Sequence, residues 1–171
     1  MARSSVQSEI RQSRPFRSKK QEATIALLRT ASVVGRALSR VLEPWGLSLA
    51  QYNALRIIRG AAPDGIATLA IRERMIEEGT TITRILDKLE QSGYIRRERA
   101  LPDRRQVICE VTAGGRRLLD SIDPVVDAAD EEAVASLSAR EVGQLIELLD
   151  TVRAGNAARG APRTMVRAGD A

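Results

Sequence analysis

Residues 80–112 place the strongest constraint on the fold, because they combine an amphipathic helix with a hairpin that follows it directly. One apolar stripe is expected along the helix, since its apolar residues recur at the i, i+3, i+4 and i+7 spacing: Ile82, Ile85, Leu86 and Leu89. Thr80 and Thr81 precede the stripe and can cap the free N–H groups. Gly93 stands where a helix commonly ends.

A basic two-stranded hairpin is predicted directly after this glycine. Residues 95–99 and 106–111 have strand character, and a Leu-Pro-Asp turn at residues 101–103 separates them. Five arginines lie in the hairpin: Arg96, Arg97, Arg99, Arg104 and Arg105. A helix followed by a cationic hairpin can touch two grooves of DNA, so the stretch suggests a polyanionic partner.

The overall composition narrows the classes of protein and site. The formal net charge of +5 is compatible with a polyanionic partner, and 43% hydrophobic with only 2% aromatic residues predicts an aliphatic core of packed helices. The chain has no histidine and a single cysteine, so we expect no metal site, no disulfide within the chain and no cofactor. It has no run of about eighteen apolar residues and no export signal, which predicts a cytoplasmic protein with no membrane partner.

Five further helices are predicted around residues 80–112, each from apolar residues at helical spacing. They cover residues 21–42, 48–60 and 67–76 before this stretch, and residues 113–137 and 138–155 after it. Ser48 and Gln51 have the spacing of a capping box at one helix start, and Thr112 can cap another.

The predicted elements divide the chain into four parts. Residues 47–112 are expected to form a winged helix-turn-helix DNA-binding domain, and residues 21–46 and 113–154 a helical dimerisation region. Residues 1–20 are a basic arm, either a solvated disordered tail or a segment that adds phosphate contacts. Residues 155–171 have no periodicity and are expected to be a disordered tail.

The apolar faces of the terminal helices favour a homodimer. They carry too many large side chains to leave in water: Leu28, Val34, Leu38, Leu145, Ile146 and Leu149. Each such side chain favours burial by roughly 1.5–3 kcal/mol. A two-fold dimer would place two recognition helices about 34–36 Å apart, the spacing of successive major-groove faces. The expected fold class is mainly α with a small β-hairpin wing, a dimeric winged helix-turn-helix with dimerisation helices from both termini.

Two runs of the sequence carry a family resemblance. One is TITRILDKLEQSGYIRR at residues 81–97, and the other is PDRRQVICEVTAGG at residues 102–115. They resemble the recognition helix and the wing signature of the MarR (multiple antibiotic resistance regulator) family. The signature positions are occupied here by Asp103, Arg105, Cys109, Val111, Thr112 and Gly115. The resemblance covers about residues 21–154 and implies a dimeric regulator whose first, fifth and sixth helices form the dimer domain.

The resemblance also implies DNA contacts at particular positions. Arg105 resembles the wing-tip arginine that enters the minor groove, with Asp103 as the carboxylate that orients it. Arg84 matches a recognition-helix arginine, which can bond guanine O6 and N7 together. The other expected contacts go to phosphate, or to a thymine methyl for the threonines: Thr80, Thr81, Thr83, Lys88, Arg97, Arg99 and Arg104. The alternative for these residues is a charged surface that faces only solvent.

A small-molecule site is a further expectation, since MarR-like regulators often bind small aromatic or phenolic acids. Trp45, Tyr52 and Arg56 are the candidates, because an aromatic ring and an arginine suit an aromatic carboxylate. The alternative is that Trp45 plugs the helix junction and Tyr52 belongs to the core. Cys109 falls at a core-side strand position, which predicts a buried, inert thiol rather than a redox sensor.

The expected function is transcriptional regulation rather than catalysis. The chain lacks histidine, a Gly-rich phosphate loop and a plausible pair of catalytic carboxylates, so no enzymatic activity is expected. The chain is expected to bind a palindromic double-stranded DNA operator as a homodimer and to act as a repressor, with release by a small aromatic effector as an option. The alternative is a helical dimeric protein-interaction module without specific DNA binding, against which the clustered arginines argue.

Overall fold

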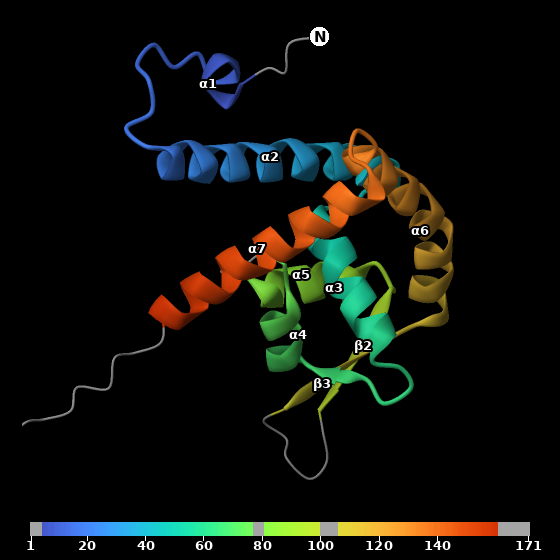
Figure 1. Cartoon of the computed structure of the whole chain (residues 1–171). Helices are drawn as coiled ribbons and strands as arrows, with labels where there is room; N and C mark the ends of the chain where they lie inside the picture. The colour runs from blue at the N-terminus through green and yellow to red at the C-terminus, as the bar shows by residue number, and fades with distance from the viewer. Residues whose placement is uncertain (1–4, 77–80, 100–105, 161–171) are drawn as a thin grey trace, which may run out of the picture. The chain divides into compact units, whose positions relative to one another are not determined.

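The computed structural model describes residues 5–76, 81–99 and 106–160, and the chain divides into two compact units, residues 1–130 and 131–171. The elements are, in chain order (Figure 1), α1 Val6–Glu9, α2 Lys19–Leu42, the 3-10 helix η1 Glu43–Trp45, α3 Leu49–Gly60, β1 Ile66–Ala67, α4 Thr68–Arg74, α5 Ile82–Gln91, β2 Ile95–Arg99, β3 Val107–Val111, α6 Ala113–Val134 and α7 Ala139–Gly160. The described part of the chain is therefore mainly helical with one small sheet, as predicted. None of the helices in the described ranges is long and apolar enough to cross a membrane.

A three-stranded antiparallel sheet, in the order β1–β3–β2, contains the predicted hairpin. β2 has the predicted bounds, and β3 begins at Val107, one residue later than predicted. The two strands pair over their whole length, from Ile95 opposite Val111 to Arg99 opposite Val107. The sequence pattern does not predict β1, because two residues are too few to show the alternation of a strand.

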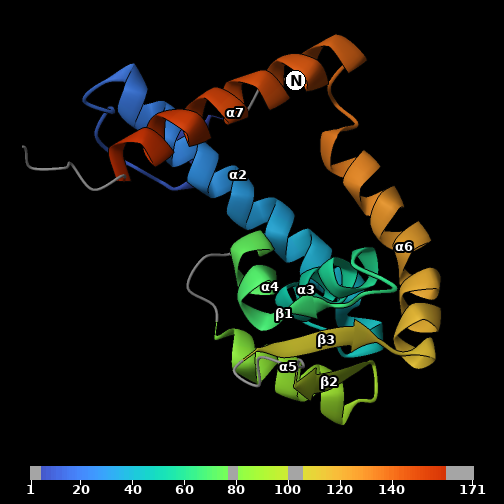
Figure 2. The same cartoon turned by 90° about the horizontal axis from the view of Figure 1, so that it is seen from below.

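The core of the first unit is built from α3, α5, the sheet and α6. Fully buried side chains come from each of these helices: Leu55 and Ile58 of α3, Leu86 and Leu89 of α5, and Leu119 and Ile122 of α6. The predicted stripe of α5 is confirmed for Ile85 (7% exposed), Leu86 and Leu89 (0% exposed), while its first member, Ile82, packs partly buried against the core. α5 contacts α3 on one side and β2 on another (Figure 2). This packing decides which face of α5 remains outside.

The starts of α3 and α6 follow the predicted caps, whereas the start of α5 does not. The Gln51 N–H donates to Ser48 Oγ (3.2 Å) and the Ser48 N–H donates to the Gln51 side chain (2.9 Å), which completes the capping box of α3. Thr112 Oγ1 accepts from the Gly115 N–H (3.0 Å) at the start of α6. Thr81 stands at the cap position of α5 but makes no side-chain cap bond, and Thr80 lies outside the described residues.

Helices at both ends of the chain extend beyond their predicted ranges. α1 lies within the segment interpreted as a disordered arm, and α2 already begins at Lys19. Glu9 of α1 pairs with Arg29 of α2 across 3.4 Å, which ties the short helix to the long one. α7 runs to Gly160, into the segment interpreted as a tail. Residues 6–9 and 19–20 are thus helical, where the disordered-tail interpretation expected no helix.

The first turn of α6 packs directly on the backbone of Tyr94, the residue before β2. The Thr112 N–H donates to the Tyr94 carbonyl (3.0 Å), and Thr112 Oγ1 donates to the Gly93 carbonyl (2.7 Å). A Cβ atom on Gly115 would lie 2.2 Å from the same Tyr94 oxygen, so this position requires glycine. The close approach gives a physical reason for the glycine that ends the motif at residues 102–115.

Replacing Gly115 by alanine should destabilise the protein. The added methyl group would force the α6 backbone away from Tyr94, and overpacking of this kind costs about 1–3 kcal/mol in the free energy of unfolding. Gly114→Ala is the matched control, since its nearest neighbour, Thr112 Oγ1, would lie at 3.5 Å, an ordinary contact. Urea unfolding at matched protein concentrations measures both variants. Equal stability of the two would contradict this account of Gly115.

Candidate nucleic-acid interface

The outer face of α5 carries the polar and cationic residues expected to contact DNA. Thr83, Arg84 and Lys88 are exposed, on the side of the helix that the buried stripe leaves free. Both side chains are exposed, and among the described residues neither Arg84 nor Lys88 has an ion-pair partner. Thr81, just before the helix, is also exposed, whereas Thr80 lies outside the described residues.

The arginines of the hairpin occupy different settings. Arg99, at the end of β2, is exposed and has no ion-pair partner in the part of the chain that the structure describes. Arg96 pairs with Glu110 of β3 (2.7 Å) and with Glu98 of its own strand (3.7 Å). The predicted wing-tip residues lie outside the described residues: Asp103, Arg104 and Arg105.

Arg97, in the middle of β2, is held by two carboxylates of α5. Its Nη2 lies 2.7 Å from Asp87 Oδ1 and 2.5 Å from Glu90 Oε2, and its Nε donates to the same Glu90 oxygen at 2.9 Å. The hydrogen bond from Arg97, and then its positive charge, hold the pKa of Glu90 below its usual range, and the same bond raises the pKa of Arg97. The Arg97 side chain is only 23% exposed. The sequence predicts a phosphate contact here, whereas the structure engages this guanidinium within the protein.

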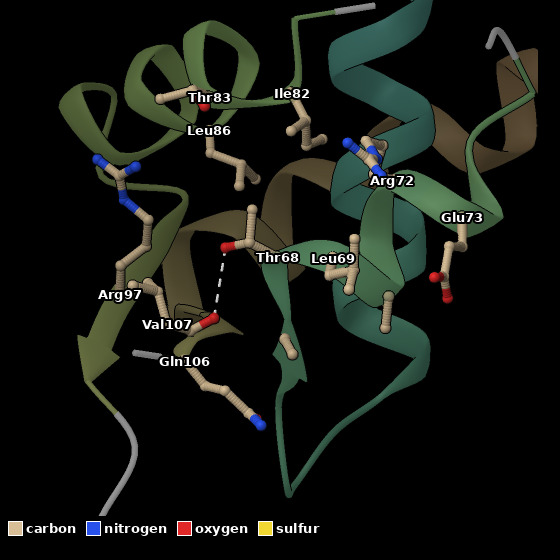
Figure 3. Close-up of a pocket in the computed structure, with 12 residues that line it drawn as sticks. Thr68, Leu69, Arg72, Glu73, Ile82, Thr83, Leu86, Arg97, Gln106 and Val107 are labelled. Carbon is tan, nitrogen blue, oxygen red and sulfur yellow. Dashed lines mark hydrogen bonds between the residues drawn. The ribbon is translucent and has the colours of Figure 1, made fainter. Parts of the chain in front are cut away.

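A groove of about 620 Å³ lies between α4, α5 and the strands β2 and β3 (Figure 3). Its lining is largely apolar, with polar and charged groups at intervals. It includes Leu69, Ile82, Leu86 and Val107 among the apolar residues, and Thr68, Arg72, Thr83 and Arg97 among the polar and charged ones. Thr68 Oγ1 donates to the Val107 carbonyl (3.3 Å) at its floor. A molecule held in this groove would lie beside α5.

The three residues expected to bind a ligand do not line this groove. Tyr52 is 3% exposed and its hydroxyl donates to Asp123 of α6 (3.0 Å). Burial, and then the bond to Asp123, raise the pKa of Tyr52 to about 12. Arg56 is exposed, with its guanidinium carbon 5.6 Å from the centre of the Tyr52 ring, and Trp45 packs partly buried against the core. These contacts agree with the alternative, in which the two aromatic residues serve packing.

The single cysteine is enclosed by the sheet and α4. Cys109 is 0% exposed, and its Sγ lies 3.8 Å from Thr68 Oγ1. Burial raises the pKa of the thiol, which disfavours the reactive thiolate. Among the described residues there is no group of three or more His, Cys, Asp or Glu side chains that could hold a metal ion.

The pairing of Arg97 with α5 is the feature of this surface that the sequence analysis missed. Asp87 and Glu90 are three residues apart, so they share one side of a helix. Two carboxylates at this spacing, just before a strand that contains arginines, weakly predict an ion pair between the helix and the strand. Arg96 and Arg99 are equally near in the sequence, and only the packing of α5 on β2 selects Arg97.

Comparison with known sequences points to one family. The sequence model of the MarR family matches residues 47–107, the segment that contains α3, α4, α5 and β2. Transcriptional regulator HosA from Escherichia coli O157:H7 is 32% identical over 103 residues, which are 60% of this chain and 75% of that protein.

Solved structures share the fold. A MarR transcription factor from Planctomyces limnophilus is 34% identical with a TM-score of 0.62, covering 80% of this chain and 99% of that chain. A mutant of MarR from E. coli in complex with operator DNA is 27% identical with a TM-score of 0.68, covering 74% of this chain and 90% of that chain. The predicted winged helix-turn-helix fold is confirmed, and this chain belongs to the MarR family.

Proposed function

We propose that this protein is a transcriptional regulator that binds double-stranded DNA with the outer face of α5 and the β2–β3 hairpin. The observation that carries the proposal is the burial of Ile85, Leu86 and Leu89, which leaves Arg84 and Lys88 exposed and unpaired within the described ranges. A helix of this kind can lie in the major groove with its outer side chains on base edges and phosphates. A related E. coli MarR structure contains operator DNA, which supports the same use of the fold here.

The residues of this surface are proposed to contact different parts of the DNA, either base edges or phosphates. Arg84 is proposed to bond base edges, since a guanidinium can contact guanine O6 and N7 together. Lys88 and Arg99 are exposed cations suited to phosphate, and Thr81 and Thr83 can donate hydrogen bonds to it. Four further residues lie outside the described residues and keep the roles expected from the sequence: Thr80, Asp103, Arg104 and Arg105.

A homodimer that binds a palindromic operator is part of the proposal. Large apolar side chains stay exposed on the terminal helices of the single chain, including Leu28 of α2 (62%) and Leu145 and Ile146 of α7 (38% and 54%). A second copy would remove such surface from water, and its two-fold symmetry would match two half-sites about 10–10.5 base pairs apart. We expect repression, because a dimer that occupies an operator can block transcription there.

Release by a small aromatic acid is proposed as the signal. The groove beside α5 supports this, because its apolar walls suit an aromatic ring and Arg72 suits a carboxylate. An occupant next to Thr83 would change the surface that α5 offers to DNA. The pocket expected at Trp45, Tyr52 and Arg56 receives less support, because the Tyr52 side chain is already buried and bonded.

The competing proposal is a helical dimer that binds another protein and has no specific affinity for DNA. A gel shift at increasing salt separates the two cheaply. A DNA-binding regulator loses affinity linearly on a log–log plot, with a slope of about −0.9 for each phosphate contact. A protein-interaction module shows no such complex.

Arg84→Ala should lower sequence discrimination, and Arg99→Ala should not. Loss of a base contact costs about 1–3 kcal/mol on the preferred sequence only, whereas loss of a phosphate contact weakens all sequences alike. The measurement is the ratio of dissociation constants for a duplex selected from random-sequence DNA and for its scrambled version. If Arg84→Ala kept the wild-type ratio, its proposed base contact would be wrong.

Ile146→Glu should convert the dimer to a monomer and weaken operator binding. The side chain is exposed in the single chain, so the change removes apolar contact between copies without disturbing a buried core. Gln144→Glu is the matched control, because it adds the same charge on the opposite side of α7, roughly 200° around the helix. Sedimentation velocity distinguishes the outcomes. A dimeric Ile146→Glu protein would exclude this face from the interface.

An aromatic acid that acts as the signal should raise the melting temperature and weaken operator binding. The expected stabilisation follows from binding to the folded state alone, about 2.7 kcal/mol at one hundred times the dissociation constant. Thermal shift against a panel of hydroxybenzoic and related acids, followed by gel shift, measures both effects. Arg72→Ala should reduce both if the groove is the site. A panel with no shift would remove the support for a ligand of this class.

A further inference from the structure

We infer that Arg97 is a positioning residue for DNA recognition, which holds α5 against β2 through Asp87 and Glu90 instead of contacting phosphate. The inference rests on the proposed DNA-binding function and assigns one of its residues to a different task. It is carried by the geometry of one guanidinium between two carboxylates.

The three groups form a compact bridge between two elements. Arg97 Nη2 lies 2.7 Å from Asp87 Oδ1 and 2.5 Å from Glu90 Oε2, and its Nε is 2.9 Å from the same Glu90 oxygen. Two guanidinium nitrogens, Nε and Nη2, therefore contact the same Glu90 oxygen, and Nη2 also contacts the Asp87 carboxylate. A planar fork of fixed geometry can do this, whereas a lysine ammonium on a flexible stem cannot fix the same orientation.

The bridge acts on the part of α5 that faces DNA. Asp87 is one turn after Arg84 and directly before Lys88, and Glu90 is one turn further on. Two attachments a turn apart limit rotation of the helix about its axis. The buried stripe holds α5 on the core, and the bridge sets how Arg84 is presented.

The local charge argues against a phosphate contact by Arg97. One guanidinium and two carboxylates carry a formal charge of −1 together, so the cluster repels a phosphate instead of attracting it. The side chain is also only 23% exposed, and it would have to leave both partners to reach DNA.

Arg99 provides the contrast within the same strand. It is two residues after Arg97, so both side chains project from the same face of β2. Arg99 is exposed and lacks an ion-pair partner among the described residues. It is therefore the matched control, an arginine in the same strand that no carboxylate of the described residues engages.

The decisive variant is Glu90→Gln, because the two roles predict opposite effects. If Arg97 positions α5, loss of Glu90 weakens the bridge and lowers the affinity ratio between a selected duplex and its scrambled version. We expect a fall of about three- to tenfold for Glu90→Gln and for Arg97→Gln, with the double variant no worse than either single one. If Arg97 contacts phosphate, Glu90→Gln frees its charge and tightens binding to both duplexes, with the ratio unchanged.

Salt dependence separates the two arginines. Arg97→Gln should leave the slope of log affinity against log salt unchanged, while Arg99→Gln should reduce its magnitude by about 0.9 for each phosphate that Arg99 neutralises. Arg97→Lys keeps the charge and should still lower the ratio. Unfolding midpoints of all variants are measured beside the binding data, and Arg97→Lys and Glu90→Gln carry the test if Arg97→Gln fails to fold.

The outcomes distinguish this inference from the proposed function. If the wild type fails to prefer any selected duplex, the proposed function itself fails. If the wild type discriminates while Glu90→Gln and Arg97→Lys keep its ratio, or if Arg97→Gln reduces the salt slope as Arg99→Gln does, the positioning role is overturned.

Discussion

Burial of the apolar stripe of α5 is the interaction on which the rest of the surface depends. Ile85 is almost fully buried and Leu86 and Leu89 are completely buried, and each contributes about 1.5–3 kcal/mol of burial free energy. With one face committed to the core, Arg84 and Lys88 are left to solvent. An energetic requirement of folding thereby also selects the face that we propose meets DNA.

Polar contacts then fix the orientation of α5 and the strands, which apolar packing determines only approximately. Arg97 joins α5 to β2 through two carboxylates, and Arg96 joins β2 to β3 through Glu110. Such partly exposed pairs add little to overall stability, so their effect is on geometry more than on the free energy of unfolding. At the other end of β2, the carbonyl of Tyr94 accepts from Thr112, which connects the hairpin to the first turn of α6.

Features with a local cause were predictable from the sequence, and features that depend on packing were not. The spacing of Ile85, Leu86 and Leu89 predicted the buried face of α5, and the bounds of β2 were predicted correctly. β1 was missed because a strand of two residues is too short to show an alternating pattern. The partners of Arg97 were missed because several arginines lie equally near α5 in the sequence. The motif identified the family, while the structure supplied the reason for Gly115.

The central claim is that two copies of α5, held apart by a dimer, bind two half-sites on one face of the duplex. Hydroxyl-radical footprinting on a duplex selected from random-sequence DNA tests this most directly. We expect two equal zones of protection related by a two-fold axis and centred about 10–10.5 base pairs apart. A single protected half-site, or even protection along the whole duplex, would contradict the claim.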